Sequence, residues 1–84
     1  MTKTILLVET DRGAGSILAG ELGKKMDIRL VTQRGEARRV LEAESVDGVV
    51  LDLEGLRGEG LAVLQTVRKI QPGAPVVVLS RSAR

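Results

Sequence analysis

Three short apolar runs along the chain each end at a polar residue. They are residues 5–8 (Ile-Leu-Leu-Val) before Glu9, residues 48–51 (Gly-Val-Val-Leu) before Asp52, and residues 75–79 (Pro-Val-Val-Val-Leu) before Ser80. Continuous apolar runs of this length, separated by longer segments, are typical of buried parallel strands joined by crossover helices. The pattern therefore predicts an α/β fold with a parallel sheet.

The segments between these runs have the spacing of amphipathic helices. Their periodic apolar residues are Ala14, Ile17, Leu18, Leu22 and Met26 in the first, Ala37, Val40 and Leu41 in the second, and Leu61, Leu64, Val67 and Ile70 in the third. Thr10 or Asp11 is a candidate N-cap for the first helix, and Gly23 a candidate C-cap. The second helix is expected to begin near Gly35, and Pro72-Gly73 to end the third.

One further strand completes the predicted order. A short strand is expected over 28–31, and the run at 48–51 belongs to a strand expected over 46–51, which gives β-α-β-α-β-α-β. Right-handed crossovers convert this order into a doubly wound parallel sheet with the strand order 2-1-3-4. Residues 1–84 are therefore expected to form a single domain in which the fourth strand lies at an edge.

Composition removes several classes of function. The chain has 84 residues, no Cys, no His and no aromatic residue, so a thiolate or imidazole mechanism is excluded and the stacking surfaces of single-strand nucleic-acid binders are absent. The net charge of +2 is too small to indicate direct nucleic-acid binding. Because no apolar run approaches the length of a membrane helix and no secretory leader is visible, we expect no membrane association and a cytoplasmic location.

Acidic and hydroxyl side chains are expected to meet at one edge of the sheet. Parallel strands end on the same edge, where open α/β sheets place their ligand sites, so Glu9, Asp11, Asp52 and Ser80 should converge. Carboxylate oxygens are ligands that Mg²⁺ prefers. An aspartate such as Asp52 can accept a phosphoryl group when a metal ion and a donor such as the Ser80 hydroxyl hold the phosphoryl oxygens.

A family resemblance is carried by four parts of the sequence. They are residues 5–11 (Ile-Leu-Leu-Val-Glu-Thr-Asp), residues 49–53 (Val-Val-Leu-Asp-Leu), Gly60, and residues 75–80 (Pro-Val-Val-Val-Leu-Ser). In this arrangement the chain resembles the receiver domains of two-component response regulators, such as the single-domain chemotaxis regulator. The resemblance covers essentially the whole chain and implies the flavodoxin-like receiver fold without its final α-β-α part.

The resemblance implies roles for individual residues. Asp52 matches the phosphoacceptor, Ser80 the switch hydroxyl, and Glu9 the first acid of the metal-binding pair, while Glu54 matches the residue whose backbone carbonyl binds Mg²⁺. By the same resemblance the phosphoryl donor is a sensor histidine kinase or a phosphotransfer protein. The chain is thus expected to be a non-enzymatic signalling domain that changes a protein-interaction surface when Asp52 is phosphorylated.

The sequence also departs from the family pattern. Thr10 stands where the family has its second metal-binding acid, and Asp11 is one position further on, so Mg²⁺ binding is expected to be weak. Arg81 follows Ser80 where a small residue is usual, and the chain ends before the family's phosphate-contacting lysine. The alternative is a pseudo-receiver that acts as an interaction or dimerisation module without phosphorylation. A Mg²⁺-dependent phosphatase is disfavoured because Glu54, not Asp, follows two positions after Asp52.

The fourth strand carries a separate expectation. Residues 76–79 are apolar on both faces and contain no charge that would discourage pairing with another chain. The sequence therefore predicts homodimerisation through the edge of this strand.

Overall fold

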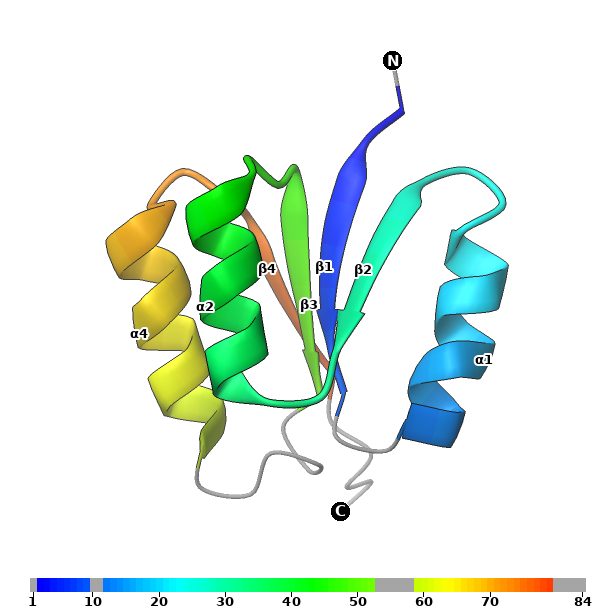
Figure 1. The fold of residues 1–84 in the computed structure, drawn as a ribbon, viewed down its shortest axis with the longest axis horizontal. Coiled ribbons are helices and arrows are strands. Elements are labelled where there is room, and N and C mark those ends of the chain that lie inside the picture. Colours follow the sequence, from blue (N-terminus) through cyan, green and yellow to red (C-terminus); the bar gives the residue numbers. More distant parts are fainter. Residues whose placement is uncertain (1, 10–11, 53–58, 80–84) are drawn as a thin grey trace.

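A computed structural model describes residues 2–9, 12–52 and 59–79 of the chain. Its elements are β1 (Thr4–Val8), α1 (Arg12–Leu22), β2 (Asp27–Val31), α2 (Arg34–Ala43), β3 (Gly48–Asp52), α4 (Gly60–Ile70) and β4 (Val76–Leu79). The strands form one parallel sheet in the order β2-β1-β3-β4, which confirms the predicted topology (Figure 1).

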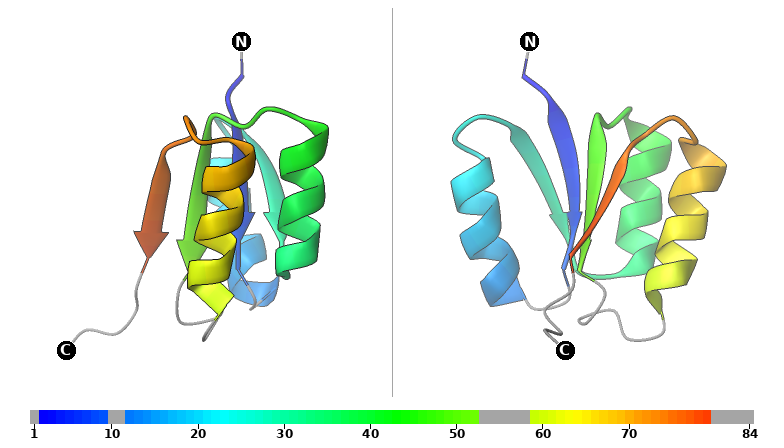
Figure 2. Two further views of the ribbon diagram at one scale, coloured as in Figure 1. Left: turned by 90° about the vertical axis from the view of Figure 1, so that its left-hand side faces the viewer. Right: turned by 180° about the vertical axis from the view of Figure 1, so that it is seen from behind.

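Helices cover the two faces of the sheet. Leu30 and Val31 at the end of β2 point to opposite faces because side chains alternate along a strand. Leu30 lies beside Gly15 of α1, whereas Val31 belongs to the core that α2 and α4 cover. Accordingly α1 lies on one side of the sheet, and α2 and α4 lie together on the other (Figures 1 and 2).

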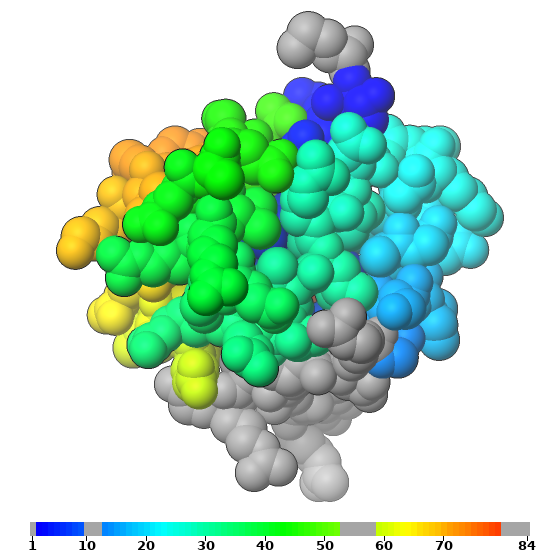
Figure 3. Space-filling view, viewed as in Figure 1, coloured from blue at the N-terminus to red at the C-terminus, as the bar shows by residue number. Residues whose placement is uncertain are grey.

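The main core lies between the sheet and the helix pair α2 and α4. Its fully buried side chains include Leu6 and Val8 of β1, Leu51 of β3, and Val63 and Val67 of α4. Burying a side chain of this size typically stabilises a fold by about 1.5–3 kcal/mol. From this side, α2 lies in front of the sheet, so little of the central strands is visible (Figure 3). Of the described helices, two therefore cover this face and one covers the other.

An ion pair fastens the C-terminal end of α2 to β2. The Arg29 side chain donates a hydrogen bond to the Glu44 carboxylate at 3.0 Å, and this bond, together with the opposite charge, raises the pKa of the guanidinium. Both side chains are partly exposed, so the pair contributes little to stability. It links the C-terminal end of α2 to β2.

Some predicted boundaries were wrong by a few residues. The third strand begins at Gly48 rather than residue 46, since Val46 belongs to the loop and its N–H donates to the Gln71 side chain. The first helix ends at Leu22, so Met26 lies beyond it, whereas Gly23 stands where the C-cap was predicted. A Cβ at Gly23 would lie 2.7 Å from the Ala19 carbonyl oxygen, which explains the glycine.

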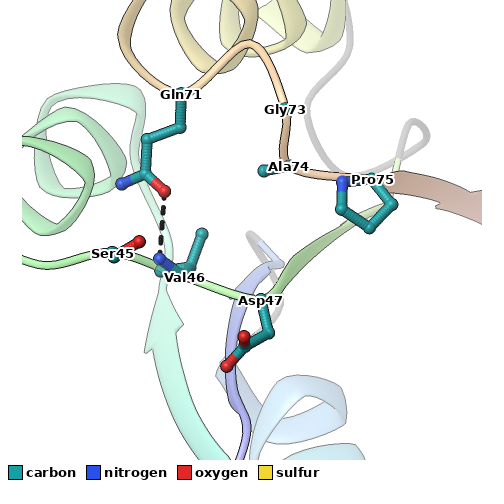
Figure 4. Close-up of a pocket in the computed structure, with 7 residues that line it drawn as sticks. All are labelled: Ser45, Val46, Asp47, Gln71, Gly73, Ala74 and Pro75. Carbon is teal, nitrogen blue, oxygen red and sulfur yellow. Dashed lines mark hydrogen bonds between the residues drawn. The ribbon is translucent and has the colours of Figure 1, made fainter.

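Gln71 joins three segments at the amino-terminal edge of the sheet. Its Oε1 accepts from the Val46 N–H at 3.0 Å, and its Nε2 donates to the carbonyls of Leu41 at 2.8 Å and Glu44 at 2.7 Å. Figure 4 shows the amide pointing from the end of α4 toward Val46, in the loop that leads into β3. Gln71 and Val46, which one of these bonds joins, also line the pocket beside the amide. We assign Gln71 a structural role.

Membrane insertion finds no support in the helices that the structure describes. Within residues 2–9, 12–52 and 59–79, none is long and apolar enough to cross a membrane.

Candidate functional site

Two acids lie at the carboxyl ends of neighbouring central strands. Glu9 directly follows β1, and Asp52 is the last residue of β3. The preceding residues of the two strands, Val8 and Leu51, are register partners, and the Glu9 N–H donates to the Val31 carbonyl of β2 at 3.0 Å. The parallel ladder thus brings together two carboxyl groups that are far apart in sequence, as predicted.

Both acids are buried although both are ionisable. Each is 3% exposed, and they are the buried charged residues of the part of the chain that the structure describes. Burial of a carboxylate is costly unless hydrogen bonds or opposite charge compensate it. Acids at such positions are therefore candidates for function rather than for stability alone.

A cavity opens beside these acids on the α1 side of the sheet. Its volume is about 520 Å³, and it is lined by Glu9, Ala14, Ile17, Leu18, Glu21, Asp52 and Leu79. Glu9 and Asp52 form its acidic wall, and α1 contributes mainly apolar side chains together with Glu21. Glu9 and Asp52 were predicted from the sequence, but Glu21 and the apolar lining were not, because Ile17 and Leu18 of α1 read only as helix positions and Leu79 only as the end of a strand.

Close packing between α1 and β1 fixes the position of Glu9. Gly15 of α1 approaches so closely that a Cβ there would lie 3.1 Å from Cγ of Glu9, 3.3 Å from its Cβ and 2.8 Å from Cδ1 of Leu30. Such distances are too short for an unshifted side chain. Gly15 therefore allows α1 to pack closely against Glu9, and the sequence pattern did not single it out.

The carboxylate oxygens at the carboxyl ends of β1 and β3 suit a hard cation as ligands. Glu9 and Asp52 supply carboxylate oxygens on one cavity, which is the type of ligand that Mg²⁺ prefers. Across the described residues no group of three acidic side chains comes together as a metal site. The other predicted members, Asp11, Glu54 and Ser80, lie outside the described residues, as do Thr10 and Arg81.

Similarity to known proteins agrees with this geometry. No family model matches the chain. Over 77 residues, or 90% of the chain, it is 34% identical to the transcriptional regulatory protein GlrR of Escherichia coli K12. This match covers 17% of that protein, so the chain spans about one sixth of the curated relative.

Solved structures of receiver domains match almost the whole chain. The non-phosphorylated HemR receiver domain of Leptospira biflexa is 30% identical, with a TM-score of 0.84 over 99% of this chain and 68% of that one. The response regulator TrrA of Thermotoga maritima, solved in complex with Mg(2+)-BeF, is 26% identical, with a TM-score of 0.84 over 98% of this chain and 72% of that one.

The fold and the matches place the chain among the flavodoxin-like signalling domains that carry acidic residues at the carboxyl ends of their central strands. Within that class, the chain belongs to the receiver domains of response regulators. The family resemblance seen in the sequence is thereby confirmed, and with it the assignment to two-component response regulation. Receiver domains are generally non-enzymatic signalling domains.

Proposed function

We propose that Asp52 accepts a phosphoryl group and that the chain works as the receiver of a phosphorelay. The observation that carries this proposal is the burial of Asp52 and Glu9 side by side, at the ends of the two central strands and on one cavity. A buried aspartate at this position has an accessible opening on the α1 side, through which a donor can approach.

The donor is a phosphohistidine of a sensor histidine kinase or a phosphotransfer protein. A carboxylate oxygen of Asp52 forms a bond to phosphorus while the bond between phosphorus and the histidine nitrogen breaks. That nitrogen keeps the electron pair of the broken bond. The product is an aspartyl phosphate, so a negative group is added beside Glu9.

Glu9 and Asp52 would hold a Mg²⁺ ion, together with the backbone carbonyl of Glu54 and with Asp11. Bound there, Mg²⁺ would offset the charge of the phosphoryl oxygens. Thr10 supplies a neutral oxygen where the family has an acid, so the affinity should be low. The donor set described above supports this assignment.

The output of the domain would be a change in protein binding. The Ser80 hydroxyl would donate a hydrogen bond to the phosphoryl group and so pull the end of β4 toward that group. We infer no direct nucleic-acid binding by this segment, no membrane contact, and a cytoplasmic location. The alternative is a pseudo-receiver whose partner binding needs neither Asp52 nor Mg²⁺.

Intact-mass spectrometry after treatment with acetyl phosphate and MgCl₂ tests the proposal. The wild-type chain should gain one phosphoryl group, and Asp52→Asn should gain none. Asp27→Asn is the matched control, because Asp27 is an exposed acid at the start of β2, on the opposite edge of the sheet. It should be modified like the wild type.

Two results would reject the phosphoacceptor role. One is an unmodified wild-type chain at saturating acetyl phosphate and Mg²⁺. The other is modification that persists in Asp52→Asn. The first result would favour the pseudo-receiver, whose partner should still bind after Asp52→Ala.

A further inference from the structure

A surface groove runs between α2 and α4, on the face of the sheet that these two helices cover. Its volume is about 410 Å³, and every residue that lines it belongs to one of the two helices. The helices lie side by side and run in the same direction (Figures 1 and 2). Both are described over their whole length, so the walls of the groove do not depend on the residues that follow β4.

Basic side chains line both walls of this groove. Arg34 and Arg38 come from successive turns of α2, and Lys69 comes from the last turn of α4. Glu42 is the acid among the residues that line the groove, so three positive charges lie with one negative charge. The groove therefore has a net positive charge of two, which equals the net charge of the whole chain.

These cations are largely free to bind an anion. In the part of the chain that the structure describes, neither Arg34 nor Lys69 forms an ion pair or a side-chain hydrogen bond. Arg38 donates from Nε to the Glu42 carboxylate at 3.2 Å, and its terminal NH₂ groups take no part in that bond. An incoming carboxylate can therefore bind all three basic residues without breaking a hydrogen bond of the fold.

The groove also has an apolar lining. Ala62 and Ile70 of α4 line it, and both are half-buried. The hydroxyl of Thr66 donates to the Ala62 carbonyl at 2.9 Å, so it is engaged within its own helix. Basic walls around apolar side chains match a partner that presents acids and apolar residues together, which a free inorganic anion does not.

We propose that this groove binds an acidic amphipathic helix of a partner protein. Arg34 and Arg38 are four residues apart, which places them about 6 Å apart along the axis of α2. Two acids four residues apart on a partner helix have the same spacing, and each carboxylate can form a two-bond pair with one guanidinium. Apolar residues of the partner's adjacent row then pack on Ala62 and Ile70. This binding does not depend on phosphorylation of Asp52.

A second copy of the chain fits the groove less well than such a helix. Glu21, Glu42 and Glu44 each pair with a basic side chain of their own copy. Among the described residues, none of the other exposed acids lies on a helix. The chain therefore presents no acidic helix face that would complement the groove of a second copy.

A nucleic acid is also a poorer occupant. The chain has no aromatic side chain on which a base could stack. Glu42 stands among the basic residues of the groove, where it would repel a row of phosphates. The apolar lining adds nothing to contacts with a phosphate backbone, whereas it favours a peptide.

Fluorescence anisotropy with a labelled synthetic peptide tests the proposal. The probe is a helix of about 18 residues, long enough to fold in water, with Glu at two positions four residues apart and Leu on the adjacent row. The control peptide has Gln in place of each Glu. The wild-type chain should bind the Glu peptide about tenfold more tightly than the Gln peptide, and added salt should reduce this difference.

Charge-reversal variants with matched controls locate the binding site. Arg34→Glu, Arg38→Glu and Lys69→Glu should each weaken binding of the Glu peptide by about tenfold or more. Arg39→Glu and Arg68→Glu make the same charge change on the same two helices, at exposed residues that do not line the groove, and should bind like the wild type. All five substituted side chains are exposed, so the variants should keep the circular dichroism spectrum of the wild type.

Two further measurements use the same peptides. The double variant Arg34→Glu/Lys69→Glu should prefer a peptide with Lys in place of each Glu. In nuclear magnetic resonance spectra of the wild-type chain, the Glu peptide should shift amides of α2 and α4 and leave those of β2 unchanged. Asp52→Asn should bind the Glu peptide like the wild type, which separates this proposal from the phosphoacceptor role.

Three results would overturn the proposal. The first is that the wild-type chain binds the Glu and Gln peptides equally, or binds neither. The second is that Arg39→Glu and Arg68→Glu weaken binding as much as the groove variants do, which would indicate a diffuse charge effect. The third is that a DNA duplex of about 20 base pairs displaces the peptide and binds more tightly, which would assign the groove to nucleic acid.

Discussion

Leu79 of β4 lies beside Asp52 of β3 as its register partner, and both side chains line the same cavity. An apolar residue thus forms the wall next to the buried acid. Leu79 is also the last residue of β4. The acidic site therefore lies directly beside the carboxyl end of β4.

Removing the carboxylate of Asp52 should leave the fold intact. Asp52→Asn keeps the size of the side chain and one of its two acceptor oxygens while removing one of two neighbouring buried acids. We expect an unchanged circular dichroism spectrum and a Tm that is equal or higher by up to about 5 °C, the shift produced by about 1 kcal/mol in a domain of this size. A large fall in Tm would show that the charge of Asp52 stabilises the fold.

Mg²⁺ binding should depend on the residue after Glu9. Thr10→Asp replaces a neutral oxygen by a carboxylate at the family's metal-binding position, so the affinity measured by titration calorimetry should rise about tenfold or more. Glu9→Gln should lower it. Equal affinities of Thr10→Asp and the wild type would indicate that Asp11 already fills this role or that no site exists.

Two glycines of α1 should respond oppositely to alanine. Gly20 is exposed and has nothing within 4 Å of an added Cβ, so Gly20→Ala should stabilise the helix by about 0.5–1 kcal/mol. Gly15→Ala has the same helix-propensity gain but must displace the Leu30 methyl and Glu9. Urea unfolding should show a gain at Gly20 and none, or a loss, at Gly15.

The same pair of variants also reports on the site. Gly15→Ala should weaken any Mg²⁺ binding because Glu9 must move, whereas Gly20→Ala should leave it unchanged. If Gly15→Ala unfolds with the stability of Gly20→Ala, the close contact with Glu9 is not a constraint.

Gln71→Ala should be among the more destabilising substitutions in the chain. It removes the acceptor of the Val46 N–H and the donor to the Leu41 and Glu44 carbonyls. Leaving partly buried backbone groups without partners costs about 1–3 kcal/mol. Gln65→Ala, an exposed position on α4, is the control and should change the free energy of unfolding by less than about 0.5 kcal/mol.

The sequence alone was sufficient for the architecture. Apolar runs at residues 5–8 and 48–51, with helical periods between them, predict a doubly wound sheet. Buried strands that alternate with helices usually pair in parallel, and the crossovers between them are almost always right-handed. The meeting of Glu9 and Asp52 follows from the same rule, since parallel strands end on one edge. Each of these inferences depends on patterns that are local along the chain.

Tertiary structure decided the contacts that connect distant segments. Nothing near Gln71 indicates that its amide reaches Leu41 and Val46, and nothing near Gly15 indicates that it packs on Glu9. Likewise, alternation along β4 leaves open which residues face β3, because either parity satisfies an all-apolar strand. Only the three-dimensional register places Leu79 beside Asp52 and directs the backbone groups of Val76 and Val78 away from β3. The reason is that side-chain packing and hydrogen-bond direction depend on neighbours that are far away in sequence.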